Sequence, residues 1–174
     1  MHEHAIVDSV KDKILETIER TDHLVSMAPA GRLAWRPAVH ENEAGAMDLG
    51  HLLGHLLSCM AGFCAALHAA FPVELSAMGE LKALTVDHSC APDETRKRIE
   101  VYSRHIAKGL AHCAEADLGR KIRTVFVPEG ETLLTLLMGN LEHLTNHKYQ
   151  LFFYLKLLGV RAGTADLYCL RGES

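Results

Sequence analysis

The chain has 174 residues, of which 48% are apolar and 23% are charged, as in an ordinary soluble globular protein. Its formal net charge of −4 gives no basic footprint, so we expect no nucleic-acid partner. No apolar run approaches the roughly 20 residues that span a bilayer, and residues 1–13 lack the apolar segment of a signal peptide. We therefore expect a cytoplasmic protein with no membrane partner, folded as a single domain over residues 1–174.

Apolar residues recur at helical spacing in four segments, at about residues 5–27, 48–68, 92–116 and 131–158. Asp48 is a suitable N-terminal cap for the second segment, and Pro92 is a favourable first residue for the third. Gly159 follows the fourth, at a position where helices often end in the left-handed conformation. Four long helices without a convincing sheet predict an all-α fold, a four-helix bundle with long connections.

The connections differ in character. A polar stretch after the first helix holds the only tryptophan, Trp35, and the segment from Pro72 to Cys90 reads as a loop with one short helical turn. Residues 120–130 are short, β-branched and closed by a proline and a glycine, which predicts an extended connector outside any sheet. In the tail we expect three side chains to dock on the bundle: Leu167, Tyr168 and Leu170.

The five cysteines form an odd set without any Cys-x-x-Cys spacing; they are Cys59, Cys64, Cys90, Cys113 and Cys169. This pattern argues against a disulfide framework and against a structural zinc knot. We expect most of them to be small buried apolar residues.

Two of the helices carry a pair of histidines four residues apart: His51 and His55 on the second, His143 and His147 on the fourth. That spacing places both rings of a pair on one side of a helix, and neutral imidazole is the commonest protein ligand of metal ions. A helical wheel puts His51 opposite the apolar arc of its helix and His55 at the edge of that arc. His143 and His147 lie along one edge of the apolar stripe of the last helix.

These positions favour a site made by His55, His143 and His147, whose three nitrogens would leave coordination positions open for water or substrate. Incidental surface polarity is the alternative. Several further residues are candidates for lining such a pocket: Trp35, Cys59, Asn140, Gln150 and Tyr154. Each also has an ordinary explanation, as a loop anchor for the tryptophan, as core packing for the cysteine, and as surface polarity or packing for the rest. No general base is identifiable, and no carboxylate pattern supports a di-iron centre.

At these residues the chain resembles the DinB/YfiT-like family of metal-binding four-helix bundles. EHLTNHKYQLFFYLKLLG is similar to the family's last helix, DLGHLLGHLLS to its second helix with the metal-binding histidine at His55, and LAWRP to its Trp-x-Pro element. The family commonly has Arg-Gly where this chain has Lys148 and Tyr149. The resemblance spans nearly the whole chain and implies one DinB-like domain, with Lys148 as a candidate for the missing positive contact.

The resemblance also implies one divalent transition metal (nickel, zinc or iron) bound by His55, His143 and His147, and a homodimer. Some relatives are thiol-dependent transferases or isomerases. The leading hypothesis is therefore a metal-dependent hydrolase or thiol-dependent transferase acting on a small molecule. Two alternatives stay open: a non-catalytic metal-binding or stress-associated homodimer, and a helical dimerisation module whose histidines are incidental.

Overall fold

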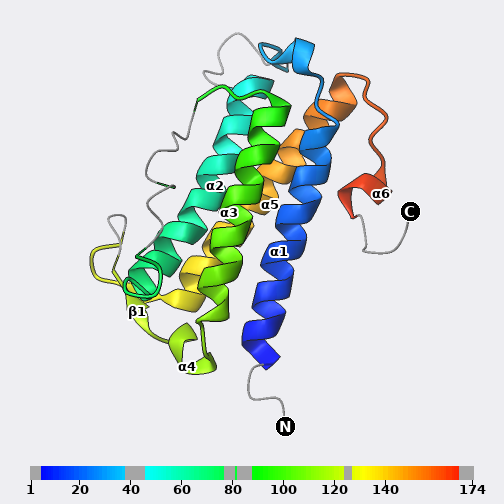
Figure 1. Ribbon diagram of the computed structural model, residues 1–174. Coiled ribbons are helices and arrows are strands. Elements are labelled where there is room, and N and C mark those ends of the chain that lie inside the picture. The colour runs from blue at the N-terminus through cyan, green and yellow to red at the C-terminus, as the bar shows by residue number, and fades with distance from the viewer. Residues whose placement is uncertain (1–4, 38–45, 77–80, 82–87, 124–126, 169–174) are drawn as a thin grey trace.

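The computed structural model describes residues 5–37, 46–76, 81, 88–123 and 127–168, and it confirms the predicted four-helix bundle. The long helices are α1 (Ala5–Ser26), α2 (Leu49–Ala70), α3 (Pro92–Ala111) and α5 (Leu133–Leu157). In Figure 1, α1 and α5 run upward from the end where the N-terminus lies, and α2 and α3 run downward. α2 packs against α3 and α5, and α1 closes the ring by packing against the same two helices.

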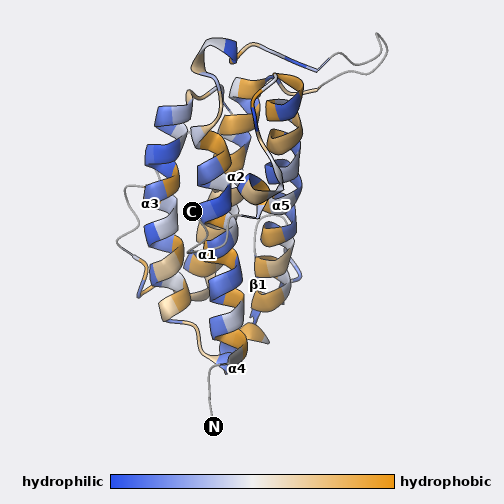
Figure 2. Cartoon of the chain, turned by 90° about the vertical axis from the view of Figure 1, so that its right-hand side faces the viewer, coloured by the Kyte–Doolittle hydropathy of each residue, from blue (hydrophilic) through white to orange (hydrophobic). Residues whose placement is uncertain are grey.

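α2 is the core helix of this bundle. Its leucines, with Met60 and Phe63, are fully buried, and Figure 2 shows the apolar colour concentrated on α2 and α5 while α1 and α3 carry more polar residues. Contrary to our expectation, α2 is long and apolar enough to cross a bilayer by length and composition alone. Most of its apolar window is buried inside the bundle, however, so its composition is explained by core packing.

The ends of the long helices follow the sequence signals closely. The Asp48 side chain caps α2 by accepting a hydrogen bond from the backbone N–H of His51 at 2.8 Å. Pro92 opens α3, and Thr132 caps α5 by accepting from the N–H of Thr135 at 3.1 Å. Gly159, just beyond α5, has a φ of +78°, the left-handed conformation predicted for it.

Two predictions at the lower end of the bundle were wrong. The third helix stops at Ala111, and residues Glu115–Leu118 form a separate short helix, α4. The break lets the Glu115 carboxylate accept hydrogen bonds from the N–H groups of Ile6 (2.8 Å) and Val7 (3.3 Å), two of the donors that the start of α1 leaves unpaired. The predicted connector also forms a small antiparallel ladder between β1 (Lys121–Ile122) and β2 (Glu131–Thr132).

The upper connections and the tail are short ordered elements. A 3₁₀ turn, η1 (Ala30–Arg32), leads towards Trp35, whose carbonyl accepts from the N–H of Leu49 at 2.9 Å. The tail forms α6 (Thr164–Leu167) against α1, with Leu167 buried and the Tyr168 hydroxyl 2.5 Å from the Tyr149 hydroxyl. The predictions for Leu170 and for most of the 72–90 loop fall outside the described residues.

Candidate metal centre

Three histidine rings from α2 and α5 meet in the upper half of the bundle. The ring centroids of His55 and His147 are 4.4 Å apart, those of His143 and His147 are 4.8 Å apart, and those of His55 and His143 are 5.2 Å apart. α2 and α5 are antiparallel, so the beginning of α2 lies beside the second half of α5. This arrangement brings together residues that are 88 positions apart in the chain.

The spacing of the donor atoms suits a shared metal ion. The Nε2 atoms of His55 and His143 are 3.2 Å apart. Bonds of about 2.0–2.1 Å from a zinc ion place neighbouring ligand nitrogens of a tetrahedron about 3.3 Å apart, close to this distance. Two Nε2 atoms that face each other need either one proton or one cation between them. The imidazoles therefore fit a metal of the class that the sequence predicts.

A chain of hydrogen bonds fixes the tautomer of His147. The Met47 carbonyl can only accept, so the Tyr154 hydroxyl donates to it at 2.9 Å and accepts from the Gln150 amide at 3.1 Å. The remaining amide oxygen of Gln150 then accepts from Nδ1 of His147 at 2.8 Å. A proton on Nδ1 leaves the Nε2 lone pair of His147 available, as a metal ligand requires. This relation gives Gln150 and Tyr154 an orienting role.

Of the other residues predicted to line the pocket, Trp35 and Cys59 lie near the three histidines, whereas Asn140 bonds to the backbone of its own helix. Trp35 packs edge-on against the Tyr154 ring, with centroids 5.2 Å apart. This contact fixes Tyr154, the residue at the end of the hydrogen-bonded series that begins at His147. Cys59 is buried one turn below His55, and its sulfur and one nitrogen each of His55 and His143 all lie within 4.8 Å of one another. Asn140 instead donates to the Leu136 carbonyl at 2.9 Å.

Lys148 does not supply the positive contact considered for this surface. Its side chain is buried beside α1, with Nζ 5.2 Å from the ring centroid of Tyr149 and 5.9 Å from that of Tyr168. Burial lowers the pKa of the Lys148 ammonium, and the neighbouring charge of Arg20 lowers it further. One position along a helix turns a side chain by about 100°, which places Lys148 away from the face that carries His147.

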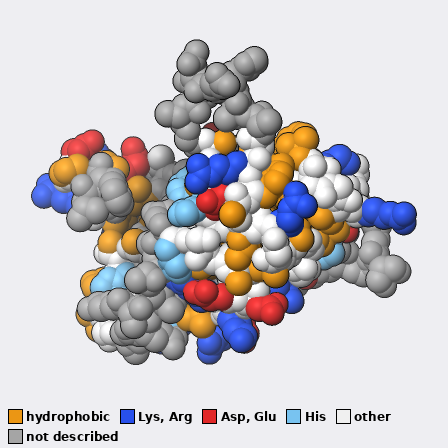
Figure 3. All heavy atoms as spheres, turned by 90° about the horizontal axis from the view of Figure 1, so that it is seen from above, with side chains coloured by type: hydrophobic (Ala, Val, Ile, Leu, Met, Phe, Trp, Pro, Cys, Tyr) orange, Lys and Arg blue, Asp and Glu red, His pale blue; other side chains and the backbone are white. Residues whose placement is uncertain are grey.

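A cavity of about 290 Å³ opens beside the histidines and was missed in the sequence analysis. It is lined by Arg36, Met47, Asp48, His51 and His55. Seen from above the bundle, in Figure 3, histidine side chains lie next to basic and acidic ones. A larger groove of about 720 Å³ between α1 and α3 has no histidine or cysteine in its lining. Of these two cavities, the smaller one adjoins the candidate metal ligands.

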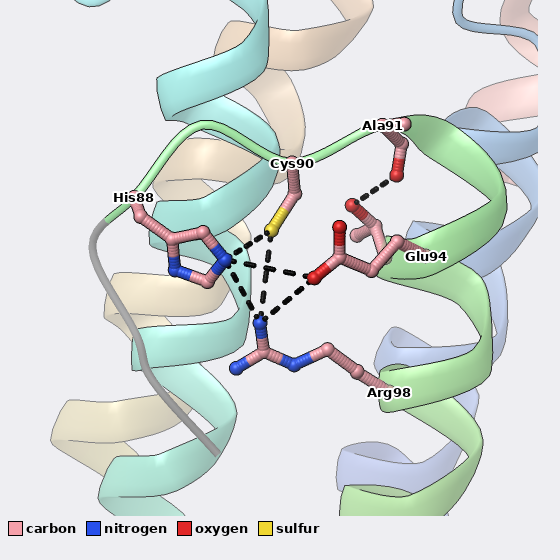
Figure 4. A network of polar contacts seen from close by, with 6 residues as sticks. His88, Cys90, Ala91, Glu94 and Arg98 are labelled. Atoms are coloured by element: carbon pink, nitrogen blue, oxygen red, sulfur yellow. Dashed lines mark hydrogen bonds and ion pairs between the residues drawn. The ribbon is translucent and has the colours of Figure 1, made fainter.

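A second group of potential ligands lies where the chain enters α3. Nε2 of His88 is 3.1 Å from Sγ of Cys90 and 3.6 Å from a carboxylate oxygen of Glu94 (Figure 4). The Arg98 guanidinium fills the space between them, with Nη1 3.2 Å from the His88 nitrogen and 3.7 Å from the sulfur. Because a positive group already occupies the centre, this cluster is an anchor that ties residues 88–90 to α3.

Residues 88–90 also lie directly on α2, over two of its glycines. The N–H of Cys90 donates to the Gly50 carbonyl at 3.0 Å. A Cβ placed on Gly54 would stand only 1.7 Å from the His88 carbonyl oxygen. Gly54 lies opposite the apolar arc of α2, on the same side as His51, and residues 88–90 cover it there. Glycine is needed at this position because any side chain would displace backbone.

None of the described cysteines forms a disulfide, and all of them are buried, as predicted; they are Cys59, Cys64, Cys90 and Cys113. Burial raises the pKa of the Cys64 thiol to about 12 and that of Cys113 to about 11. Thiols in this state are poor nucleophiles at neutral pH. These two residues therefore serve packing.

The site has a pH dependence that can be measured in the metal-free protein. Burial lowers the pKa of His147 below its ordinary value of 6.5; the hydrogen bond to Gln150 opposes this change, and the nearby His55 and His143 reinforce it. The folded state thus binds fewer protons than the unfolded state. Its free energy of unfolding should be unaffected by this group above about pH 6.5 and should fall as the pH decreases through 6.5 towards the folded-state pKa.

His147→Gln gives the matched control, since glutamine is polar and does not titrate. Urea denaturation between about pH 8 and pH 5 should show the wild-type protein losing more stability than the variant. An equal loss of unfolding free energy between about pH 8 and pH 5 in the two proteins would contradict the lowered pKa of His147.

Comparison with known proteins places this geometry in a recognised fold. No protein-family model matches the chain, and no curated protein matches its sequence. Among solved structures, the chain is similar to a DinB-like protein of Bacillus subtilis, YjoA, at 18% identity and a TM-score of 0.63, over 88% of this chain and 94% of the other. It is also similar to a mycothiol-dependent maleylpyruvate isomerase at 15% identity and a TM-score of 0.52.

The second match covers 92% of this chain but only 64% of the isomerase, so this chain corresponds to about two thirds of that enzyme. Both likenesses concern the fold. The chain therefore has the DinB-like helical bundle that was predicted from its sequence.

Proposed function

We propose that this protein binds one divalent transition metal ion through His55, His143 and His147 and acts on a small molecule, as a metal-dependent hydrolase or a thiol-dependent transferase. The observation that carries the proposal is the convergence of three imidazoles from two helices, with two Nε2 atoms 3.2 Å apart. The metal is nickel, zinc or iron, because imidazole sites accept all three and availability decides among them.

The surroundings of the three histidines support a catalytic site over a purely structural one. Structural zinc sites are closed by four protein ligands, whereas three ligands leave room for a reacting molecule. The cavity beside His55 offers that room. When bound, such an ion lowers the pKa of a coordinated water or thiol towards neutrality.

The residues of this chain have distinct tasks in the proposal. His55, His143 and His147 bind the ion, and Gln150 holds the ring of His147 in the correct tautomer. Tyr154, with Trp35 against it, fixes Gln150. The likeness to an isomerase that depends on mycothiol supports a thiol as one of the reactants. Homodimer formation and cytoplasmic location stay predictions.

Metal analysis tests the proposal directly. Protein stripped with a chelator, exposed to zinc or nickel and then desalted should retain about one equivalent of metal. His55→Ala should retain almost none, whereas His68→Ala, a change at the other end of α2, should behave as the wild type. Retention of less than about a tenth of an equivalent by the wild-type protein would rule out the metal site and favour a bundle whose histidines are incidental.

A further inference from the structure

One histidine of the cavity beside the candidate metal centre has no role in the proposed function so far. His51 lies on the first turn of α2 and lines the same cavity as His55. Its side chain is about half exposed, at 50%, so a small molecule in the cavity can reach it. His51 lies opposite the apolar arc of α2, apart from the three candidate metal ligands, and its ring contacts Asp48.

Asp48 holds His51 through two hydrogen bonds. One oxygen of the carboxylate accepts both from the backbone N–H of His51 and from its Nδ1, each at 2.8 Å, while the other oxygen lies 3.4 Å from the Arg36 guanidinium. Burial raises the pKa of the Asp48 carboxyl, but these bonds outweigh burial and hold the pKa below its ordinary value. Asp48 is therefore ionised at neutral pH.

The charge of Asp48 determines where His51 carries its proton. An ionised carboxylate can only accept hydrogen bonds, so Nδ1 of His51 must be the protonated nitrogen. In the neutral ring, the other nitrogen, Nε2, then has a free lone pair and can only accept. A carboxylate that holds a histidine in this way also stabilises the imidazolium that forms when Nε2 takes up a proton.

We propose that His51 is the proton acceptor of this site, positioned by Asp48, and that the reaction consumes a nucleophile bearing an O–H or S–H group. This inference rests on the proposed function. The nucleophile, water or a thiol, loses its proton to Nε2 of His51, and the electron pair of the broken bond stays on oxygen or sulfur. That pair forms a bond to an electrophilic carbon of the substrate, the bond from this carbon to the leaving group breaks with its electron pair on the leaving group, and the proton passes from Nε2 of His51 to the leaving group.

The tautomer of His51 gives the first test, and it needs no metal and no substrate. Long-range ¹H–¹⁵N correlation spectra of metal-free protein labelled with ¹⁵N-histidine should show His51 protonated at Nδ1. Asp48→Ser retains an N-terminal cap but removes the carboxylate, so this preference should be lost in the variant. A wild-type His51 protonated at Nε2 would overturn the proposal.

Hydrolysis of 4-nitrophenyl acetate by the zinc-loaded protein gives the second test. His51→Gln places a residue that favours helix capping at the third helical position, so folding and zinc content should be unchanged. We expect its kcat/KM to fall about 10- to 100-fold, since general bases contribute about 10²- to 10⁴-fold. His68→Gln, the matched control, should stay within about twofold of the wild type.

The outcomes separate this inference from the proposed function. Zinc bound normally, with His51→Gln as active as the wild type, would overturn the role of His51 and leave the metal site standing. A wild-type protein that binds zinc but hydrolyses the ester no faster than His55→Ala would also overturn it. Failure to bind zinc would refute the proposed function, and with it the role of His51 in catalysis.

Discussion

Replacing His147 with alanine is expected to abolish the gain in melting temperature that zinc gives to the wild-type protein. A ligand present at about 100 times its dissociation constant stabilises the folded state by about 2.7 kcal/mol. The variant lacks one of three ligands and should lose most of that stabilisation. His147 is half-buried, and its lowered pKa keeps the ring uncharged at neutral pH. Its replacement therefore removes little packing and no charge interaction, and the metal-free variant should unfold close to the temperature of the metal-free wild type.

The same experiment discriminates between a catalytic ion and a structural one. If the ion mainly fixed the bundle, stripping the wild-type protein would lower its melting temperature greatly or unfold it, as occurs in small zinc domains. A catalytic site predicts a folded metal-free protein, because the buried core around α2 consists of apolar side chains and does not include the three histidines. Differential scanning calorimetry with and without zinc measures both quantities. An equal response to zinc in His147→Ala and the wild type would refute the ligand assignment.

Gly54→Ala is expected to be the most damaging small substitution on α2. The new Cβ would stand 1.7 Å from the carbonyl oxygen and 2.8 Å from the carbonyl carbon of His88, so backbone must move. Overpacking of this kind costs about 1–3 kcal/mol and occasionally more, and here it also disturbs the cluster of His88, Cys90 and Arg98. We expect a loss of at least about 2 kcal/mol in urea denaturation.

Gly139→Ala is the matched control, because it makes the same chemical change inside α5 at a position where the new Cβ meets nothing within 4 Å apart from its chain neighbours and the backbone of its own helix. Alanine favours helix over glycine by roughly 0.5–1 kcal/mol, so this variant should be slightly more stable than the wild type. Equal effects at the two positions would show that helix propensity, and not the close approach of residues 88–90, explains the result at Gly54.

The sequence allowed the bundle and the three histidines to be predicted because both depend on local periodicity. Caps such as Asp48 and Thr132 and the terminal Gly159 act within one turn, so their effect is visible in a few residues. The period of the helix gives the position of each histidine relative to the apolar stripe of its helix, which places His55, His143 and His147 at the edge of a stripe and His51 opposite it. The predicted fold is confirmed, whereas metal binding is still to be measured.

What could not be predicted depends on segments that meet only in three dimensions. The break after Ala111 allows Glu115 to cap the start of α1, although Glu115 and Ile6 are more than 100 residues apart along the chain. A wheel shows only one helix, so it does not reveal that residues 88–90 cover Gly54 on the side of α2 opposite the apolar arc. The pairing of Asp48 with His51 could have been predicted from the sequence. The cap residue and the third residue of a helix are neighbours in space, so Asp-x-x-His at the start of a helix indicates this pair.

The packing partners of α2 have a consequence for the synthesis of the chain. α2 packs against α3 and α5, and both follow it in the sequence. Translation proceeds at about 5–20 residues per second, so the roughly 90 residues from the end of α2 to the end of α5 take about 5–20 seconds. Throughout that interval, α2, which is apolar enough to enter a membrane, lacks some of the helices that bury its apolar side chains. The nascent chain should therefore depend on chaperones until α5 emerges from the ribosome.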